Sequence, residues 1–185
     1  MHYNKIYFTR VRRVRKPQRN NPTDAGVDFM VPFINEGLLA DIQKANPNNS
    51  TFSFIEDKVA NEKLFIICVQ PGGRVLIPSG VRVKFDPHES MLVNLNKSGL
   101  SSKQGIVVTA QVVDSEYSGE IHLGVMNNSD NYLHIRSDMK IAQFIHVPVF
   151  LSELSEISND QYQEIVKDFS RGTAGIGSSQ EHKED

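Results

Sequence analysis

A glycine-rich segment close to the end of the chain carries the residue types of a phosphate clamp. Arginine makes charge-assisted hydrogen bonds to phosphate oxygens, hydroxyls add neutral donors, and glycine lets the backbone approach a ligand closely. These types occur together in residues 171–179, as Arg171, Gly172, Gly175, Gly177, Ser178 and Ser179. A tail rich in glycine and serine also has the composition of a flexible linker, so this segment alone leaves both interpretations open.

An acidic residue follows an apolar strand pattern in the second half of the chain. Val112 and Val113 precede Asp114, and Tyr117 follows three positions later, before a Ser-Gly turn. This order predicts a hairpin with a carboxylate at its tip, where the carboxylate can activate water and the tyrosine can pack against a sugar or a base. Aspartate also favours turns for local reasons, so Asp114 has a structural interpretation as well.

A polar loop at residues 96–103 offers a second phosphate cradle. Lys97, Ser98 and Lys103 surround Gly99 directly after a strand pattern, although a loop that caps a short helix has the same composition. With a single cysteine and no pair of histidines at the spacing of a helical zinc site, a zinc centre built by the protein is not expected. The metal we expect is Mg²⁺ carried on substrate phosphates, which needs few protein ligands.

Composition indicates a globular protein with one substantial core. The 185 residues are 39% hydrophobic and 23% charged, with a formal net charge of −2, which argues against a generic nucleic-acid binder. The basic residues between positions 10 and 19 predict either a solvated strand face or a contact with an anionic ligand. Cys68 lies in an apolar run and is expected to be a buried structural thiol. Without a signal peptide or an apolar membrane span, we expect a cytoplasmic protein with no membrane contact.

Short β-rich runs separated by turn residues predict an all-β barrel or sandwich. A helix is expected over Glu36–Ala45, a helical turn over Gly99–Lys103, and the polar stretch Ser155–Asp168 has no assignment. We expect one β domain over residues 1–169 and a glycine-rich arm and tail over 170–185. The β-rich runs are Lys5–Val14, Val27–Pro32, Leu64–Val69, Arg74–Phe85 with a turn at Pro78–Gly80, Met91–Leu95, Gly105–Val113, Glu120–Met126, Tyr132–Ile135 and Lys140–Val149.

Five segments in a fixed order resemble the five motifs of the trimeric dUTPase family. The resemblance runs from about Lys5 to Ser179, and Pro-Gly and Pro-Ser-Gly turns between the first two motifs add to it. The segments are Ala25–Phe29, Lys97–Leu100 with Lys103 and Gly105, Val112–Gly119, Lys140–Ile145 and Arg171–Ser179.

The resemblance implies a jelly-roll-like β subunit that assembles as a homotrimer. Each active site would be shared by segments of all three chains, with the C-terminal arm reaching the site of a neighbour. The implied reaction converts dUTP and water into dUMP and pyrophosphate, with Mg²⁺ on the triphosphate. In physical terms, cations offset charge on the leaving pyrophosphate while a carboxylate orients water at the α-phosphorus.

The family's residue roles can be transferred to matching positions. Asp114 would activate water, Tyr117 would pack against deoxyribose, and the hairpin backbone around Gln111 and Val113 would read the uracil edge. Asp28 would organise a charged network. The expected phosphate ligands are Lys97, Ser98, Gly99 and Gln143, and the arm residues expected over the substrate are Arg171, Gly175, Ile176, Gly177, Ser178 and Ser179.

Several positions depart from the family pattern. Lys97 stands where arginine is usual and lacks its planar fork, and Ile176 replaces the phenylalanine that stacks over the base. The Gln111 amide would either contact the base or face solvent. Residues 33–63 form a longer connection than the family uses, interpreted as an insert that either packs over the barrel edge or binds a partner protein.

Two other functions remain open at this stage. A dCTP deaminase, or a bifunctional deaminase-dUTPase, is the nearest enzymatic alternative, but that branch needs a glutamate at the position of Gly124. Glu120 is on the same predicted strand but out of place for that role. A nucleotide-binding regulatory protein with the same fold is the second alternative, because a nucleotide site does not guarantee turnover.

Overall fold

Strands make up most of the regular structure in the described chain, and some of them show a clear alternation of buried and exposed side chains. In β6, Val81, Val83 and Phe85 are buried while the residues between them are exposed. The computed structural model describes residues 5–60, 62–86 and 88–169. The strands are β1 (Lys5–Arg10), β2 (Val27–Met30), β3 (Phe52–Glu56), β4 (Phe65–Val69), β5 (Arg74–Pro78), β6 (Val81–Asp86), β7 (Ser90–Leu95), β8 (Ile106–Thr109), β9 (Val112–Asp114), β10 (His122–Asn127), β11 (Leu133–Ile135) and β12 (Lys140–Pro148).

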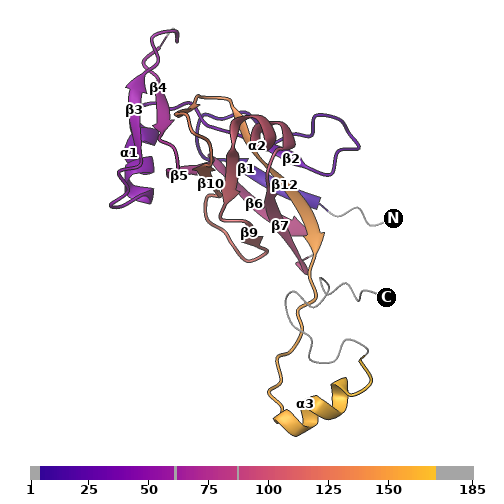
Figure 1. The fold of residues 1–185 in the computed structure, drawn as a ribbon. Helices are drawn as coiled ribbons and strands as arrows, with labels where there is room; N and C mark the ends of the chain where they lie inside the picture. Colours follow the sequence, from indigo (N-terminus) through magenta and orange to yellow (C-terminus); the bar gives the residue numbers. More distant parts are fainter. Residues whose placement is uncertain (1–4, 61, 87, 170–185) are drawn as a thin grey trace. The chain divides into compact units, whose positions relative to one another are not determined.

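The strands pair in four antiparallel sheets, which confirms the predicted all-β class. Their orders are β1-β6, β5-β10-β8, β11-β4-β3 and β2-β12-β7-β9. In the last sheet, Gln143 of β12 lies opposite Leu95 at one end of β7, and Asp114 of β9 lies opposite Met91 at the other end. Figure 1 shows β9 and the short helix α2 (Ser98–Gln104) at these opposite ends of β7.

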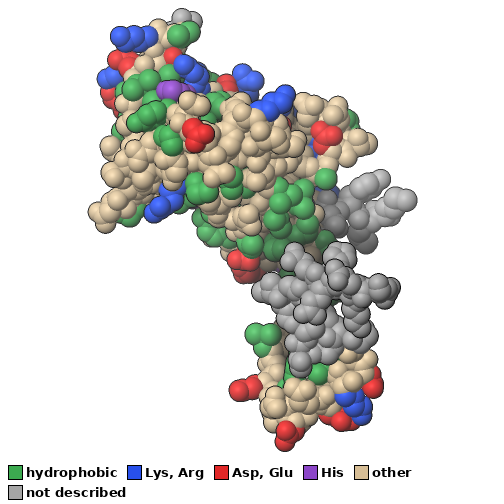
Figure 2. Space-filling model, in the orientation of Figure 1, with side chains coloured by type: hydrophobic (Ala, Val, Ile, Leu, Met, Phe, Trp, Pro, Cys, Tyr) green, Lys and Arg blue, Asp and Glu red, His purple; other side chains and the backbone are tan. Residues whose placement is uncertain are grey.

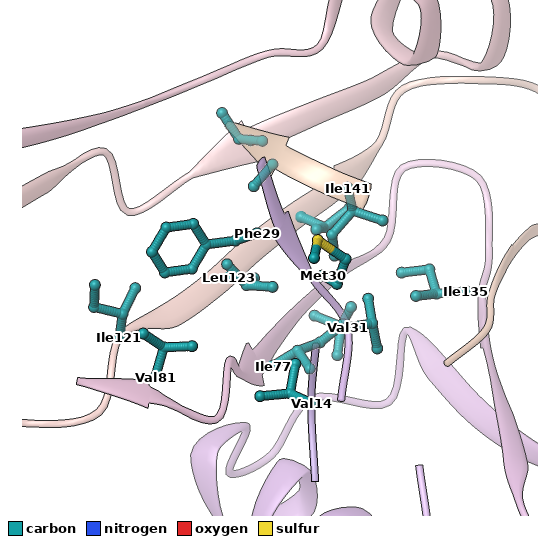
Figure 3. Packing of buried hydrophobic residues seen from close by; sticks show 14 of the residues in the cluster. Val14, Phe29, Met30, Val31, Ile77, Val81, Ile121, Leu123, Ile135 and Ile141 are labelled. Atoms are coloured by element: carbon teal, nitrogen blue, oxygen red, sulfur yellow. The ribbon is translucent and has the colours of Figure 1, made fainter. Parts of the chain in front are cut away.

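One hydrophobic core joins the sheets. Ile77 of β5, Leu123 of β10 and Ile141 of β12 are fully buried, and Figure 3 shows them pointing toward one another with Phe29 and Met30 of β2. Dense packing of branched side chains from separate sheets leaves little freedom for strand register. The core therefore provides a rigid base for the loops at the strand ends.

The segment 33–63 packs on the edge of the β domain, as one of its two interpretations predicts. Its helix α1 (Glu36–Ala45) has the predicted bounds, begins at the Asn35 cap and buries Leu38 and Ile42. The side chain of Asn46 donates to the Ile42 and Leu76 carbonyls at 2.7 Å and fixes the end of the helix on β5. The second element, β3, pairs with β4 and lies at the edge of its sheet.

Two local predictions were wrong. The run Gly105–Val113 is not one strand, because Ala110 adopts a positive φ of 56° and the chain passes from β8 in one sheet to β9 in another. Residues 112–120 do not form a paired hairpin, since β9 pairs with β7 whereas β10 pairs with β5 and β8. What remains of the predicted hairpin is a turn from Asp114 to Tyr117, closed by a 3.1 Å bond from the Tyr117 N–H to the Asp114 carbonyl.

Three residues of the basic run at positions 10–19, Arg12, Arg13 and Arg15, form ion pairs within the chain, which neither prediction for it anticipated. Arg13 pairs with Glu62 of the insert at 2.7 Å and lies 3.9 Å from the Phe33 ring centroid, and Arg15 pairs with Asp138 at 3.1 Å. Figure 2 shows basic and acidic side chains intermingled over the end of the molecule that carries α1 and β3. The basic residues thus balance nearby carboxylates.

The chain separates into two compact units, Met1–Phe150 and Leu151–Asp185. In the second unit the structure describes the helix α3 (Asn159–Val166), which lies in the stretch that had no assignment. The Ser158 hydroxyl accepts from the Gln161 N–H, and the Gln161 side chain accepts from the Ser158 N–H, forming a capping box. None of the helices in the described part of the chain has the length and apolar character needed to cross a membrane.

Candidate active site

The loop after β7 borders a cavity of about 400 Å³ with cationic and amide side chains. Lys97 occupies the position before α2 without a capping side-chain bond, and Gly105 ends the helix at a φ of 65°. A Cβ at Gly105 would meet the Asn128 carbonyl at 2.8 Å, so glycine is required there for both conformation and space. Lining residues include the predicted ligands Lys97, Ser98, Gly99 and Gln143, together with Lys103.

Asp28 is buried at the centre of a group of residues that we call the Asp28 cluster, made of Asp28, Lys97, Lys140 and Gln143. Only 4% of Asp28 is exposed, and its carboxylate contacts the Lys97 ammonium on one oxygen and the Lys140 ammonium on the other, the latter at 3.1 Å. Two cations against one carboxylate leave a net positive charge, which suits a polyanion. Sequence analysis did not select Lys140, although it begins the segment that contains Gln143.

The Gln143 side chain is held by one hydrogen bond and fits against the backbone of Gly26. Its Nε2 donates to the Asn96 carbonyl at 2.7 Å, and its Oε1 lies where a Cβ at position 26 would approach to 2.4 Å. Gly26 therefore gives the amide its place beside the loop, and any larger residue would displace it. The close approach of Gln143 to Gly26 joins two segments that are more than one hundred positions apart in the sequence.

A second cavity, of about 250 Å³, lies beside the turn from Asp114 to Tyr117, which we call the Asp114 turn. Asp114 is exposed, and Tyr117, 43% exposed, donates its hydroxyl to the Glu120 carbonyl at 2.8 Å. A Cβ at Gly119 would meet the Tyr117 ring at 2.7 Å, so glycine lets the ring fold over the loop. The remaining lining residues are Leu76, Ala110, Val112, Val113, Ile121 and His122.

Gln111 and His122 add detail that the sequence did not supply. The Gln111 side chain is exposed, while its carbonyl accepts from the Asn94 N–H at 2.7 Å. His122, which sequence analysis did not select, places Nδ1 2.9 Å from the Glu120 carbonyl. A carbonyl only accepts, so Nδ1 carries the proton and Nε2 is the ring nitrogen left for another contact.

Gly124 has no room for the glutamate that a deaminase needs. A Cβ at this position would lie 2.3 Å from the Thr109 hydroxyl oxygen and 2.9 Å from the Thr109 carbonyl oxygen. Glu120, the other candidate acid, lies before β10 and is engaged by Arg12 and by the N–H of Gly80. The deaminase alternative therefore lacks its proton shuttle.

The two cavities are at opposite ends of β7. Asp114 lies opposite Met91, and Lys97 is six positions further along the chain from Met91. At about 3.3 Å per strand residue, this separation is about 20 Å along the strand. The proposed base and the Asp28 cluster of one chain are therefore too far apart to act on neighbouring phosphates of one ligand. The predicted arm residues, Arg171, Gly175, Ile176, Gly177, Ser178 and Ser179, lie outside the described residues.

Comparison with known proteins identifies the family. A family model described as dUTPase matches residues 64–180, more than half of the chain. The chain belongs to the dUTPase family. The match includes the Lys97 loop, Asp114 and Gln143, and begins directly after the insert. Asp28 lies before the matched range, and its contacts with Lys97 and Lys140 tie it to the same site.

Similar proteins carry the corresponding enzyme name. The deoxyuridine 5'-triphosphate nucleotidohydrolase of Chlamydia trachomatis serovar D is 33% identical over 113 residues, covering 60% of this chain and 74% of the relative. The protein of that name from Photorhabdus laumondii is 32% identical over 111 residues, covering 59% and 69%.

Solved dUTPase structures share the fold. A single-residue mutant of the Staphylococcus bacteriophage 80alpha dUTPase, solved with dUpNHpp, superposes with a TM-score of 0.68 at 19% identity, covering 95% of this chain and 98% of that one. The native EIAV dUTPase has a TM-score of 0.57 at 17% identity, covering 84% and 98%. The jelly-roll-like dUTPase fold expected from the sequence is thus confirmed.

Proposed function

We propose that Asp114 is the general base of a dUTP diphosphatase. As a member of the dUTPase family, the chain hydrolyses dUTP to dUMP and pyrophosphate. In the proposed step, the Asp114 carboxylate accepts a proton from water while the water oxygen attacks the α-phosphorus and the bond to the bridging oxygen breaks. The observation that carries this assignment is an exposed carboxylate at the rim of the 250 Å³ cavity, beside Tyr117.

The same cavity is the proposed nucleoside site. The Tyr117 ring packs against deoxyribose and occupies the space that a 2′-hydroxyl would need. The backbone around Gln111 and Val113 reads the uracil edge, which backbone donors and acceptors do well because their geometry is fixed. The apolar residues Leu76 and Ile121 line the cavity and suit the faces of a pyrimidine ring.

The Asp28 cluster and the loop after β7 are the proposed phosphate site. Lys97, Ser98, Gly99 and Gln143 bind phosphate oxygens, and Asp28 holds the lysines in position. Two ammonium groups repel a cation, and the Asp28 carboxylate is already paired with both of them, so Mg²⁺ fits on the triphosphate rather than in a protein cage. When bound there, Mg²⁺ neutralises charge on the leaving pyrophosphate.

The separation of the two cavities supports a homotrimer with shared sites. One chain holds its base and its Asp28 cluster about 20 Å apart along β7, so a complete site needs Asp114 from one subunit and the cluster from another. Phe150 and Leu154, each 95% exposed, are apolar side chains that suit burial against a neighbouring copy. The arm, with Arg171, Ser178 and Ser179 over the distal phosphates and Gly175, Ile176 and Gly177 over the base, closes a neighbour's site.

The insert also presents a surface for a partner protein. β3 lies at the edge of its sheet, and an edge strand offers its outer backbone groups to another strand. A cytoplasmic location, where dUTP would be met, is part of the proposal.

The experiment is pyrophosphate release from dUTP, dCTP, dTTP and UTP in the presence of Mg²⁺, for the wild type and Asp114→Asn. We expect release from dUTP alone and its loss in the variant. Equal release by both proteins would contradict the assignment of Asp114. A wild type that binds dUTP and releases no pyrophosphate would favour the regulatory alternative.

A further inference from the structure

Arg12 connects three parts of the β domain that are far apart in the sequence. Its Nε and Nη2 donate to the two oxygens of Glu120 at 2.7 and 2.9 Å, and its Nη1 donates to Asp41 at 2.6 Å. The Glu120 side chain is 13% exposed and the Arg12 side chain 26%. A bidentate, largely shielded arginine-carboxylate pair is among the stronger polar contacts in proteins. The hydrogen bond to Glu120 raises the pKa of Arg12 further above its ordinary value.

Glu120 carries this anchoring into the proposed nucleoside site. Its Oε1 also accepts from the Gly80 N–H at 2.6 Å, which ties it to the turn between β5 and β6. Its backbone carbonyl accepts from the Tyr117 hydroxyl at 2.8 Å and contacts His122 Nδ1 at 2.9 Å. Tyr117 and His122 both line the 250 Å³ cavity. The Glu120 side chain therefore binds Arg12, while the Glu120 backbone carbonyl contacts two residues of the cavity.

The insert takes part through Asp41, which lies on α1. Glu62, another insert carboxylate, pairs with the adjacent Arg13 at 2.7 Å, but among the described residues Arg13 has no hydrogen bond to Glu120. The insert thus forms ion pairs with two neighbouring arginines through carboxylates of similar exposure. Of these two ion pairs, only that of Asp41 uses an arginine that also binds Glu120, in the loop that holds Tyr117.

We propose that Glu120 is a positioning residue for Tyr117, and that the insert tunes its effect through Asp41 and Arg12. The Arg12-Glu120 pair holds the loop so that the tyrosine ring stays against the 2′ position of the sugar. Discrimination between deoxyribo- and ribonucleotides then depends on a residue that never contacts the nucleotide. This inference rests on the proposed packing of Tyr117 against deoxyribose.

The direct test is the ratio of kcat/KM for dUTP to kcat/KM for UTP in Glu120→Gln. Glutamine keeps the size of the side chain but turns one acceptor oxygen into a donor that faces Arg12, which breaks the bidentate pair. We expect the ratio to fall about tenfold, with UTP turnover rising relative to dUTP turnover, because the ring no longer holds its place. An unchanged ratio would overturn the proposal.

Asp41→Asn and Glu62→Gln form a matched pair for the insert. Each removes one exposed insert carboxylate from an arginine, at 45% and 48% side-chain exposure. Asp41→Asn is expected to lower the dUTP:UTP ratio about twofold to threefold, the size of a partly exposed ion pair, while Glu62→Gln leaves it unchanged. Equal changes of the dUTP:UTP ratio in the two variants would contradict the proposed influence of the insert through Asp41.

Two further measurements separate this inference from the proposed function. In a double-mutant cycle with Tyr117→Phe, which removes the hydroxyl but keeps the ring, Glu120→Gln should act non-additively; additive effects would contradict the link. Hydrogen exchange at the Tyr117 N–H, bonded to the Asp114 carbonyl, should quicken in Glu120→Gln, and this readout needs no turnover. Faster exchange with an unchanged substrate ratio would show that Glu120 positions Tyr117 but that Tyr117 does not select the sugar, which would overturn the proposal at its premise.

Discussion

The Asp28 cluster and the Asp114 turn are held in place by different interactions. In the cluster, a buried carboxylate fixes two lysines directly, and a glycine makes room for the glutamine. In the turn, Asp114 and Tyr117 are exposed, and the contacts that hold them are backbone bonds and the distant Arg12-Glu120 pair. The difference teaches that the proposed phosphate site is preorganised by charge, whereas the proposed reacting site depends on how well one loop is anchored.

The largest effect is expected from Asp114→Asn. An amide cannot accept the proton of the attacking water, so kcat should fall by about 10²- to 10⁴-fold, while KM should change little because phosphate binding is proposed to lie with the Asp28 cluster. Steady-state kinetics with dUTP measure both. A rise in KM at unchanged kcat would show that Asp114 contributes to substrate binding rather than to the chemical step. The Asp28 cluster and the Asp114 turn would then not differ in function.

Asp28→Asn tests the cluster. Losing the buried charge leaves the two ammonium groups without their counter-ion, and we expect the free energy of unfolding to fall by about 3 kcal/mol. KM for dUTP should rise because Lys97 is no longer oriented. Denaturant unfolding and kinetics measure the two effects. Lys140→Gln is the matched control, since Asp28 then keeps Lys97; an equal loss of stability in both variants would show that Lys97 alone does not satisfy Asp28.

His146 predicts a pH effect on stability outside both regions. Its Nε2 lies 2.7 Å from the Ser90 hydroxyl, and burial, with the nearby charge of Arg19, lowers the pKa of the imidazole. As pH falls below about 6.5, the unfolded chain binds a proton that the folded chain does not, so stability decreases until the folded pKa is reached. Well above pH 6.5 the imidazole is neutral in both the folded and the unfolded state, and His146 then adds no pH dependence. Thermal melts of His146→Gln should lose this part of the pH dependence, and an unchanged acid slope would contradict the assignment.

Treatment of the folded protein with a thiol reagent should have the smallest effect on function, because Cys68 is buried. Burial raises the pKa of its thiol, so little reactive thiolate is present in the folded chain. Alkylation by iodoacetamide at neutral pH should be at least about tenfold slower in the folded protein than in denaturant. Rapid alkylation of the folded enzyme would contradict the burial of this residue.

The strands and α1 were predictable because their signals are local. Alternation identifies β6, and α1 has a capping asparagine, a spaced apolar face and an Asn-Pro stop. The break between β8 and β9 was missed because an alanine at positive φ carries no such signal. The helix α3 was missed although its capping box is visible as Ser158 and Gln161, because most of its residues are polar and none of them is buried.

The candidate site was predictable only in part, because local patterns identify its residues but do not show which of them come into contact. Ordered motifs located Asp28, Lys97 and Asp114, but the contacts of Asp28 with Lys97 and Lys140 arise from the pairing of β12 with β2 and β7. Arg12 and Glu120 are 108 positions apart, and no local pattern connects them. Lys140 was within reach of the sequence, because it opens the motif that contains Gln143.

The most direct test of the account is complementation between two inactive variants, Asp114→Asn and Lys97→Gln. After both are unfolded, mixed in equal amounts and refolded, a shared site can take its aspartate from one variant and its lysine from the other. Random assembly of trimers then gives about a quarter of wild-type sites intact, so we expect about a quarter of wild-type pyrophosphate release from dUTP. Activity no higher than that of the separate variants would contradict a site that is divided between subunits.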